Sequence, residues 1–416
     1  MRIVVDLTPV LPGGQNGGLK PLVLSLLREL IALAPHVEFV LLTSSATDAE
    51  LAPLDAENAR RLCVVGPIRA AQAPASRRGN RVSLRRRVRL RMTRILPPRL
   101  MLWIELAYLA TVGRQPKGPG LLTRLGANLL FSPFANLSFH EPGVPSVSLI
   151  HNLQVYQYPR FFGPEERSAQ HKELQRTVRL SDRVVCTSAF VYRTILDKTD
   201  VSTARVVTIQ PRTMCRLGRV EEHVLPSVLG RLGVERDEFL LYPGTFLPHK
   251  NHRMLFTAFG VCMARDPGWR LKLVCPGDRS AGFDELVHTI RTMGLEDSVV
   301  LPGFVSDTDL AALYQSCRAV IVPSLYAGLS LAVIEAIAFH APLLCAGHPS
   351  LQEAAGEAAM YFDPVLLADV VRAIELAARG PSFPQRVAGA DDMDVASGHP
   401  MRTAEEYLRL LSEVAA

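Results

Sequence analysis

The stretch that decides the fold is Pro323-Ser324-Leu325-Tyr326-Ala327-Gly328-Leu329-Ser330-Leu331-Ala332-Val333-Ile334-Glu335-Ala336. It follows a β-branched apolar run and passes through a glycine-containing loop into a helical pattern that begins near Ser330. The first N–H groups of a helix lack partners within it, so this end could hold a diphosphate. Glu335 lies a little over one turn into the helix, where its carboxylate could accept hydrogen bonds from sugar hydroxyls. The helix dipole alone would also favour a Glu there.

Strand and helix patterns alternate on both sides of this stretch, which predicts an α/β fold with parallel sheets. The first set of predicted strands covers residues 2–6, 37–42, 129–131, 146–150, 183–186 and 205–209. The pattern then restarts, with predicted strands at 239–244, 271–275, 299–301 and 319–322. Two doubly wound, Rossmann-like halves of similar size imply a central ligand cleft at the carboxyl ends of the strands.

The length of 416 residues suggests two or three domains. We expect an N-terminal Rossmann-like domain over residues 1–215 and a C-terminal one over 216–396. The boundary is placed in a polar, Arg- and Glu-rich stretch around 216–222. A tail at 397–416 carries a short amphipathic helix.

The charge is concentrated in one segment. The 46 Lys and Arg exceed the 40 Asp and Glu by six, but eleven Arg lie between residues 69 and 99, where there is no acidic residue. The rest of the chain is therefore mildly acidic, which argues against a uniformly basic nucleic-acid binder. We predict a basic insert at about 69–112. Leu84, Val88, Met92 and Ile95 form a helical stripe among its Arg residues, and this amphipathic helix, followed by the apolar 100–104, would let 69–104 meet an anionic membrane surface. A solvated charged loop is the alternative interpretation.

Cysteine usage and the N-terminus indicate a cytoplasmic protein. The seven Cys are odd in number and scattered without a CxxC pair, as in a reduced protein. The first residues contain Asp6 and break at Pro9, unlike a signal peptide. The longest apolar run, 100–112, is too short to span a membrane and contains Glu105.

Three further stretches carry candidate chemistry. Four Gly within residues 13–18 would let the backbone approach a ligand, although a flexible turn would look the same. Lys250 follows a strand end and opens a helix, where a phosphate would sit; a solvent-facing Lys is the alternative. His151 ends a strand and is a catalytic or hydroxyl-binding candidate, or a structural His. No metal motif is present, and the cluster Asp391, Asp392 and Asp394 is interpreted as solvated.

Four motifs in this order resemble the retaining GT-B glycosyltransferases of family 4, the group 1 glycosyl transferases. The motifs are Gly244 to Asn251, Leu301 to Leu310, Pro323 to Ala336, and Glu353 to Pro364. The N-terminal half matches more loosely, through the glycine loop, His151 and 158–162. The resemblance covers most of the chain except about 43–128.

The resemblance implies a nucleotide diphosphate sugar as donor substrate, bound mainly by the C-terminal domain, and no cofactor or metal. In that picture Lys250 holds the diphosphate, with His249 as a partial aid, and Glu335 takes the ribose hydroxyls. The implied catalytic residues are His151, Lys250 and Glu335. The implied donor-binding residues are Gly17, Gly18, Gly244, Thr245, His249, Val305, Tyr326, Leu329, Ser330 and Leu331. The tail helix would cross back onto the N-terminal domain.

Several positions depart from the family pattern. Ala327 replaces the first Glu of the family's E-x7-E pair, which is thought to contact the hydroxyls of the donor sugar. Thr245 replaces a basic residue, a variant common in mannosyltransferase-like members, and His249 replaces a frequent Arg. Asn152 stands where Asp is usual.

The favoured hypothesis is a retaining hexosyltransferase, with GDP-mannose as the favoured donor. It would act on a glycan or lipid-linked acceptor in surface polysaccharide or lipopolysaccharide synthesis, at the inner face of the membrane. Because of Ala327, the alternative is a catalytically impaired GT-B protein that binds sugar nucleotide or supports a partner transferase. A third hypothesis is a sugar-nucleotide epimerase of the same fold, which the group 1 motifs disfavour. No nucleic-acid partner is expected.

Overall fold

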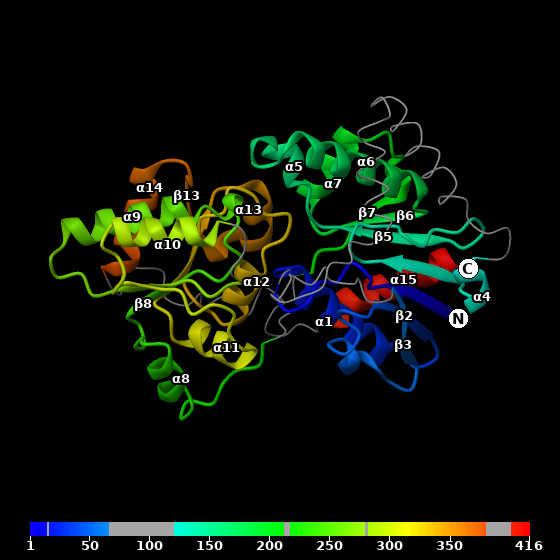
Figure 1. Cartoon of the computed structure of the whole chain (residues 1–416), viewed down its shortest axis with the longest axis horizontal. Coiled ribbons are helices and arrows are strands. Elements are labelled where there is room, and N and C mark those ends of the chain that lie inside the picture. The colour runs from blue at the N-terminus through cyan, green and yellow to red at the C-terminus, as the bar shows by residue number, and fades with distance from the viewer. Residues whose placement is uncertain (15, 66–119, 212–216, 279–281, 380–400) are drawn as a thin grey trace, which may run out of the picture.

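The computed structural model describes residues 1–14, 16–65, 120–211, 217–278, 282–379 and 401–416. The predicted basic insert at 69–112 falls outside the described residues, as does the Asp391, Asp392 and Asp394 cluster. Figure 1 shows two lobes side by side, each built on one β-sheet, with both marked chain ends in the lobe that holds the first sheet.

The N-terminal domain is built on a seven-stranded parallel sheet. Its strands are β1 (Arg2–Asp6), β2 (Glu38–Ser44), β3 (Ala59–Val65), β4 (Leu129–Ser132), β5 (Ser146–Ile150), β6 (Arg183–Cys186) and β7 (Val206–Thr208). They lie in the order β3-β2-β1-β4-β5-β6-β7, so the direction of winding reverses next to β1. Val4 and Val5 of β1 are fully buried, as expected for a parallel sheet covered on both faces.

Helices flank this sheet on both sides (Figure 1). They are α1 (Leu19–Leu33), α4 (Leu121–Leu125), α5 (Gln154–Gln157), α6 (Pro164–Leu180) and α7 (Ala189–Lys198), with 3-10 turns η1 (Ala52–Leu54), η2 (Pro159–Phe161) and η3 (Thr203–Arg205). In α1, Leu22, Leu26 and Leu30 recur every four residues and are buried in the domain core. This apolar stripe is what makes the segment a helix that packs on the sheet.

A helix from the far end of the sequence completes the N-terminal domain. α15 (Met401–Ala415) packs against α1 and β4 and contributes Tyr407 and Leu411 to the N-terminal core. The ring of Tyr407 lies 6.0 Å from that of Phe131, centroid to centroid. The second lobe is therefore flanked in sequence by two parts of the first.

The C-terminal domain is built on a six-stranded parallel sheet. Its strands are β8 (Phe239–Leu241), β9 (Lys272–Val274), β10 (Val299–Val300), β11 (Ala319–Val322), β12 (Leu343–Ala346) and β13 (Ala359–Phe362). Their order is β10-β9-β8-β11-β12-β13. Its helices are α8 (Leu225–Arg231), α9 (His252–Arg265), α10 (Phe283–Thr292), α11 (Asp307–Ser316), α12 (Leu331–Ala338), α13 (Pro349–Ala355) and α14 (Leu367–Ala378), with turns η4 (Pro248–Lys250) and η5 (Gly356–Ala358).

The predicted fold class, α/β with two doubly wound domains, is confirmed. The strands β3, β12 and β13 were not among those predicted. Of the ten predicted strands, four have the observed bounds, four are longer than the observed strand by one to three residues, and two are shorter by one residue. In each domain the winding reverses beside the first strand, β1 or β8. Open parallel sheets bind ligands beyond the carboxyl ends of their strands, at the point where the winding reverses. We therefore expect a ligand-binding edge beside β1 in one domain and beside β8 in the other.

Candidate active site

A cavity of about 500 Å³ lies between the two domains. It brings together all of the site residues predicted from the sequence. From the N-terminal domain these are Gly17, Gly18 and His151, and from the C-terminal domain they are Gly244, Thr245, His249, Lys250, Val305, Tyr326, Leu329, Ser330, Leu331 and Glu335. Because both domains supply the wall, the shape of the cavity depends on the relative orientation of the domains.

The glycine loop, defined here as residues 11–14 and 16–18, forms the N-terminal side of the cavity. A side chain at Gly14 would place its Cβ 3.0 Å from Cδ2 of Phe304 in the other domain. Gly17 has a φ of +56°, a left-handed conformation that side chains disfavour, and it faces Thr245. These glycines therefore let the loop backbone lie directly against the C-terminal domain.

Lys250 is held in the cavity wall by the turn η4. The hydroxyl of Tyr242 donates to the carbonyl of Lys250 at 2.8 Å. Asn251 closes the turn with a φ of +61°, and its Nδ2 donates to two proline carbonyls at 3.2 and 2.9 Å. Left-handed backbone suits Asn better than most residues, which explains this residue at the turn.

The charge of this turn resides on Lys250. Burial lowers the pKa of Lys250 to about 8, so most of the ammonium stays charged at neutral pH. Burial, and secondarily the charge of Lys250, lowers the pKa of His249 to about 3, so that imidazole is neutral. No acidic side chain within the described residues forms an ion pair with Lys250, which suits the lysine to an anionic ligand.

The amino end of α12 opens onto the same cavity, next to Ser330 and Leu331. The Ser330 side chain makes no capping hydrogen bond, so it leaves the first N–H groups of the helix to other partners. Glu335 lies further along the helix with 3% of its surface exposed. The hydroxyl of Tyr314 donates to its Oε2 at 3.0 Å, which fixes the carboxylate in the wall.

His151 lies at the carboxyl end of β5 and is 6% exposed. Burial lowers the pKa of His151 to about 3, an effect that the nearby Pro133 carbonyl opposes only weakly. The imidazole is therefore neutral at physiological pH. A neutral imidazole in the cavity wall can exchange hydrogen bonds with a sugar hydroxyl without adding charge.

The loop after β11 packs directly on the segment that carries His151. A Cβ at Gly328 would lie 1.6 Å from the carbonyl oxygen of His151, so only glycine fits there. The backbone N–H of Leu153 donates to the hydroxyl of Tyr326 at 2.8 Å. These contacts place His151 and the amino end of α12 on adjacent walls of one cavity.

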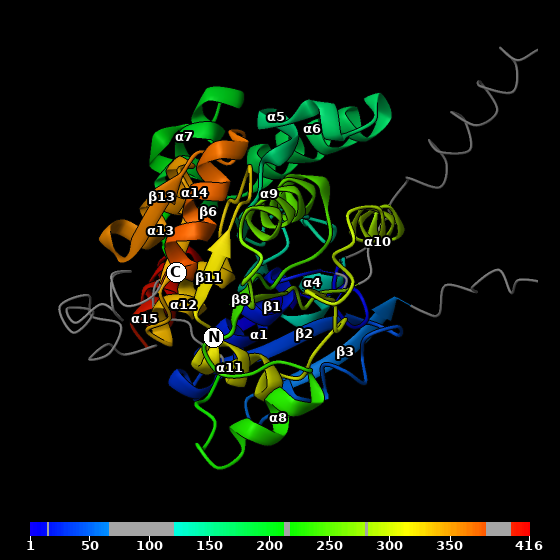
Figure 2. The same ribbon diagram turned by 90° about the vertical axis from the view of Figure 1, so that its left-hand side faces the viewer.

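A second interdomain contact lies behind this loop, where α13 packs against α7 (Figure 2). The Glu353 carboxylate accepts from the N–H groups of Ala189 and Phe190, at 2.6 and 3.1 Å. The ring of Phe190 lies 4.9 Å from that of His348. The Glu353 carboxylate at the amino end of α7 complements the helix dipole and stabilises the observed orientation of the two domains.

Ala327 forms part of the cavity wall and is 4% exposed. Its carbonyl accepts a hydrogen bond from the hydroxyl of Ser350, which fixes the loop from behind. The acidic side chains that line the cavity among the described residues are Glu50, Asp278, Asp307 and Glu335.

Several residues of the cavity wall were not predicted from the sequence. Lys20 and Glu50 line it from the N-terminal domain, and Phe304, which is 70% exposed, lines it from the other. Lys20 lies two residues after the glycine loop and could have been noticed for that reason. Glu50 lies in a polar connection without a motif, so no sequence signal marks it.

The described residues offer neither a cluster of metal ligands nor a helix that could span a membrane. No group of three or more His, Cys, Asp or Glu is arranged to hold a metal ion in the described part of the chain. Among the helices described, none combines the length and the apolar character needed to cross a membrane.

Comparisons with known proteins agree with this geometry. Residues 231–389 match the family described as Glycosyl transferases group 1. The O-antigen chain mannosyltransferase B of Escherichia coli is 26% identical over 222 residues, 53% of this chain and 57% of that protein. The GDP-mannose:cellobiosyl-diphosphopolyprenol alpha-mannosyltransferase of Komagataeibacter xylinus is 31% identical over 177 residues, 41% of this chain and 44% of that protein. The chain thus spans about half the length of these relatives.

Among solved structures, Anabaena Alr3699/HepE in complex with UDP and glucose superposes with a TM-score of 0.68 at 14% identity. The superposition covers 99% of this chain and 100% of that one. At this identity the likeness concerns the fold, which is the two-domain GT-B arrangement.

Proposed function

We propose that the protein is a retaining, metal-independent hexosyltransferase, because residues 231–389 match the group 1 glycosyl transferases and the chain has the GT-B fold. It would move mannose from GDP-mannose to a glycan or lipid-linked acceptor in surface polysaccharide synthesis. The names of two curated relatives, both mannosyltransferases, support this choice of sugar.

The proposal rests on one observation: candidate residues from both domains meet in one cavity. Lys250 and the amino end of α12 come from one domain, and the neutral His151 comes from the other. A cation and free N–H groups on one wall suit the diphosphate of a sugar nucleotide. Glu335 on the same wall suits hydroxyl groups, because a carboxylate accepts hydrogen bonds from them.

In the proposed reaction, the bond between the anomeric carbon and the diphosphate oxygen breaks while the acceptor oxygen attacks from the same face. The acceptor's proton passes to the departing phosphate oxygen, so the anomeric configuration is kept. Lys250 and the α12 N–H groups stabilise the charge that develops on the leaving diphosphate. His151, being neutral, orients a sugar hydroxyl by hydrogen bonding.

The test is transfer from radiolabelled GDP-mannose to polyprenyl-diphosphate-linked acceptors, with UDP-glucose as a second donor. We expect mannosyl transfer, with the anomeric configuration of the product, read by NMR, the same as in the donor. Absence of transfer or donor hydrolysis with any common sugar nucleotide, in protein shown to be folded, would contradict the proposal.

The alternative function, which Ala327 motivates, predicts a different result. A catalytically impaired protein that binds sugar nucleotide or supports a partner transferase would bind GDP-mannose in calorimetry yet show no turnover. If Ala327→Glu then created transfer activity, the small side chain at this wall would be the cause of the impairment.

We further propose that the protein works at the cytoplasmic face of a membrane, through the basic segment 69–104. Arg side chains on an amphipathic segment favour anionic lipid headgroups, and such binding weakens with salt. Cosedimentation with vesicles of phosphatidylcholine alone, or with added phosphatidylglycerol, tests this. Vesicle binding that depends on neither anionic lipid nor salt would overturn the proposed membrane role.

A further inference from the structure

A buried lysine outside the predicted site holds the glycine loop in shape. Lys20 is the second residue of α1 and is only 5% exposed. Its Nζ donates to the carbonyls of Leu11 and Gly13 at 2.9 and 3.0 Å, and lies 2.5 Å from Oε1 of Glu50. An ammonium has three N–H groups, so these three partners satisfy it completely.

Glu50 binds the loop as well as the lysine. Its Oε2 accepts from the backbone N–H of Gly13 at 3.3 Å, while its Oε1 pairs with Lys20. The carboxylate thus bridges the loop and α1. A buried ammonium that lost this partner would be strongly unfavourable, so the pair ties the loop to its observed conformation.

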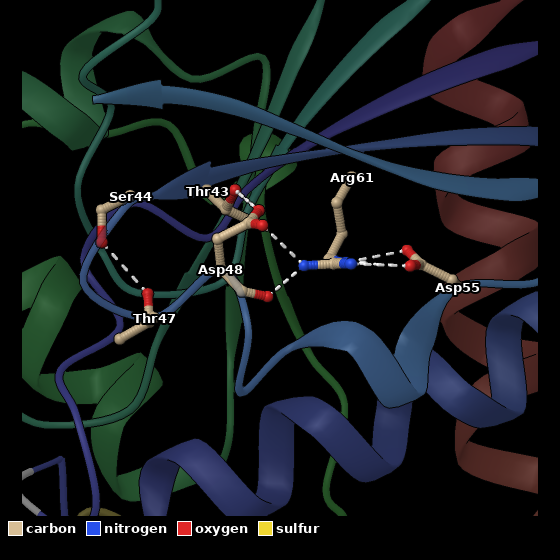
Figure 3. Close-up of polar contacts among 6 residues, drawn as sticks. All are labelled: Thr43, Ser44, Thr47, Asp48, Asp55 and Arg61. Carbon is tan, nitrogen blue, oxygen red and sulfur yellow. Dashed lines mark hydrogen bonds and ion pairs between the residues drawn. The ribbon is translucent and has the colours of Figure 1, made fainter. Parts of the chain in front are cut away.

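The segment that carries Glu50 is itself fastened to the sheet, as Figure 3 shows. Arg61 of β3 donates to both carboxylate oxygens of Asp55 at 2.9–3.0 Å and to Oδ2 of Asp48 at 2.7 Å. Asp48 also accepts from the hydroxyl of Thr43 at 2.5 Å. The connection between β2 and β3 is therefore fixed on both sides of Glu50.

This chain of contacts ends at the cavity. The loop that Lys20 holds lies against Phe304 and Thr245 of the C-terminal domain, through Gly14 and Gly17. Lys250 and α12, in contrast, belong wholly to the other domain. A change in the loop should consequently alter the N-terminal side of the cavity and leave the diphosphate side intact.

We propose that Lys20 and Glu50 are positioning residues, whose ion pair holds the glycine loop in the conformation that closes the cavity over the donor sugar. This inference rests on the proposed glycosyl transfer for its catalytic consequence. Its structural part, the shape of the loop, does not depend on the reaction. The two parts are tested separately.

The first test measures hydrogen–deuterium exchange by mass spectrometry of the free, full-length protein. Lys20→Met removes the donors and keeps the side-chain length, and Glu50→Gln removes the charge of the more exposed partner. We expect the amides of 11–18 to exchange at least tenfold faster in both variants. The control Glu38→Gln breaks an ion pair with Arg2, whose side chain is more exposed than that of Lys20, at the amino ends of β1 and β2, and should leave these amides unchanged.

Unchanged exchange in the loop of both variants would overturn the proposal. So would an increase spread evenly over the whole N-terminal domain, because that would indicate general destabilisation. The Glu50→Gln variant provides the result if Lys20→Met does not fold. Neither outcome depends on the identity of the sugar or the acceptor.

The second test measures transfer kinetics and GDP affinity. For both variants we expect kcat to fall at least tenfold while the Kd for GDP stays within twofold, with Lys20→Arg recovering part of kcat. Faster loop exchange with an unchanged kcat would overturn the positioning role. Unchanged exchange with a raised acceptor KM would show direct substrate binding by Glu50 instead. If the wild type transfers no sugar, the proposed function fails, and the exchange experiment still decides the role in the loop.

Discussion

At the scale of single residues, the cavity wall holds Lys250, whose pKa lies near the physiological range, together with an imidazole that stays neutral. Burial lowers the pKa of Lys250 to about 8 and the pKa of His151 to about 3. Over the range from pH 6 to 9, Lys250 thus changes charge in this wall while His151 does not. The sequence predicted both residues from their places at strand ends, but their protonation states depend on burial that only the fold creates.

Nucleoside diphosphate binding should weaken as the pH rises through about 8, because the free protein then loses the Lys250 charge. Below that pH the ammonium is present and affinity should be constant. Above it, the Kd for GDP should rise by up to roughly tenfold per pH unit, as expected for uptake of one proton on binding. Isothermal titration calorimetry from pH 6 to 9.5 measures this.

The matched variant is Lys250→Gln, which cannot titrate. Its affinity should be lower at neutral pH and flat across the same range. A wild-type profile that is also flat would assign the diphosphate to other groups.

Tyr314→Phe should weaken donor binding through Glu335, because the hydroxyl of Tyr314 donates to Oε2 of that carboxylate. Hydrogen bonds to charged groups contribute about 1.5–3 kcal/mol, so we expect the donor KM to rise by roughly tenfold or more. In a double-mutant cycle with Glu335→Gln, the effects should be clearly non-additive. Additive effects would show that the two side chains act independently.

At the scale of elements, the predictable parts were those with strong apolar runs. β1 and β11 contain uninterrupted β-branched runs, and β5 is buried along its whole length; the sequence identified all three strands. β3 was missed because Arg60 and Arg61 interrupt its apolar pattern, as is tolerated at a sheet edge. The Lys20–Glu50 pair joins residues 30 positions apart, and no local pattern predicts such a contact.

α15 should be essential for the stability of the N-terminal domain. Tyr407 is 2% exposed and packs on Phe131, so Tyr407→Ala should lower the free energy of unfolding by about 3 kcal/mol or more. Urea denaturation followed by circular dichroism measures the change. Leu376→Ala, at a 41% exposed position of α14, is the control and should cost less than about 0.5 kcal/mol.

At the scale of the whole molecule, activity depends on how closely the domains approach. Gly328→Ala should force them apart, because its Cβ would lie 1.6 Å from the His151 carbonyl oxygen. Misplacement by about 1 Å can reduce turnover roughly a hundredfold, so we expect a loss of that order in kcat. GDP binding should persist, and small-angle X-ray scattering should show a larger radius of gyration.

Gly230→Ala in α8 is the control for this variant, since a Cβ there meets no atom within 4 Å. It should retain wild-type activity and radius. Wild-type kcat in Gly328→Ala would mean that the closeness of this contact does not matter for transfer.

The place of α15 has a consequence for the order in which the protein folds during synthesis. Residues 401–415 leave the ribosome after the whole C-terminal domain, yet Tyr407 and Leu411 belong to the core of the N-terminal domain. The core of the N-terminal domain is therefore completed only after the C-terminal domain has been synthesised. The apolar surface that the N-terminal domain exposes during this interval is a natural target for chaperones, and the C-terminal domain is the half that can fold first.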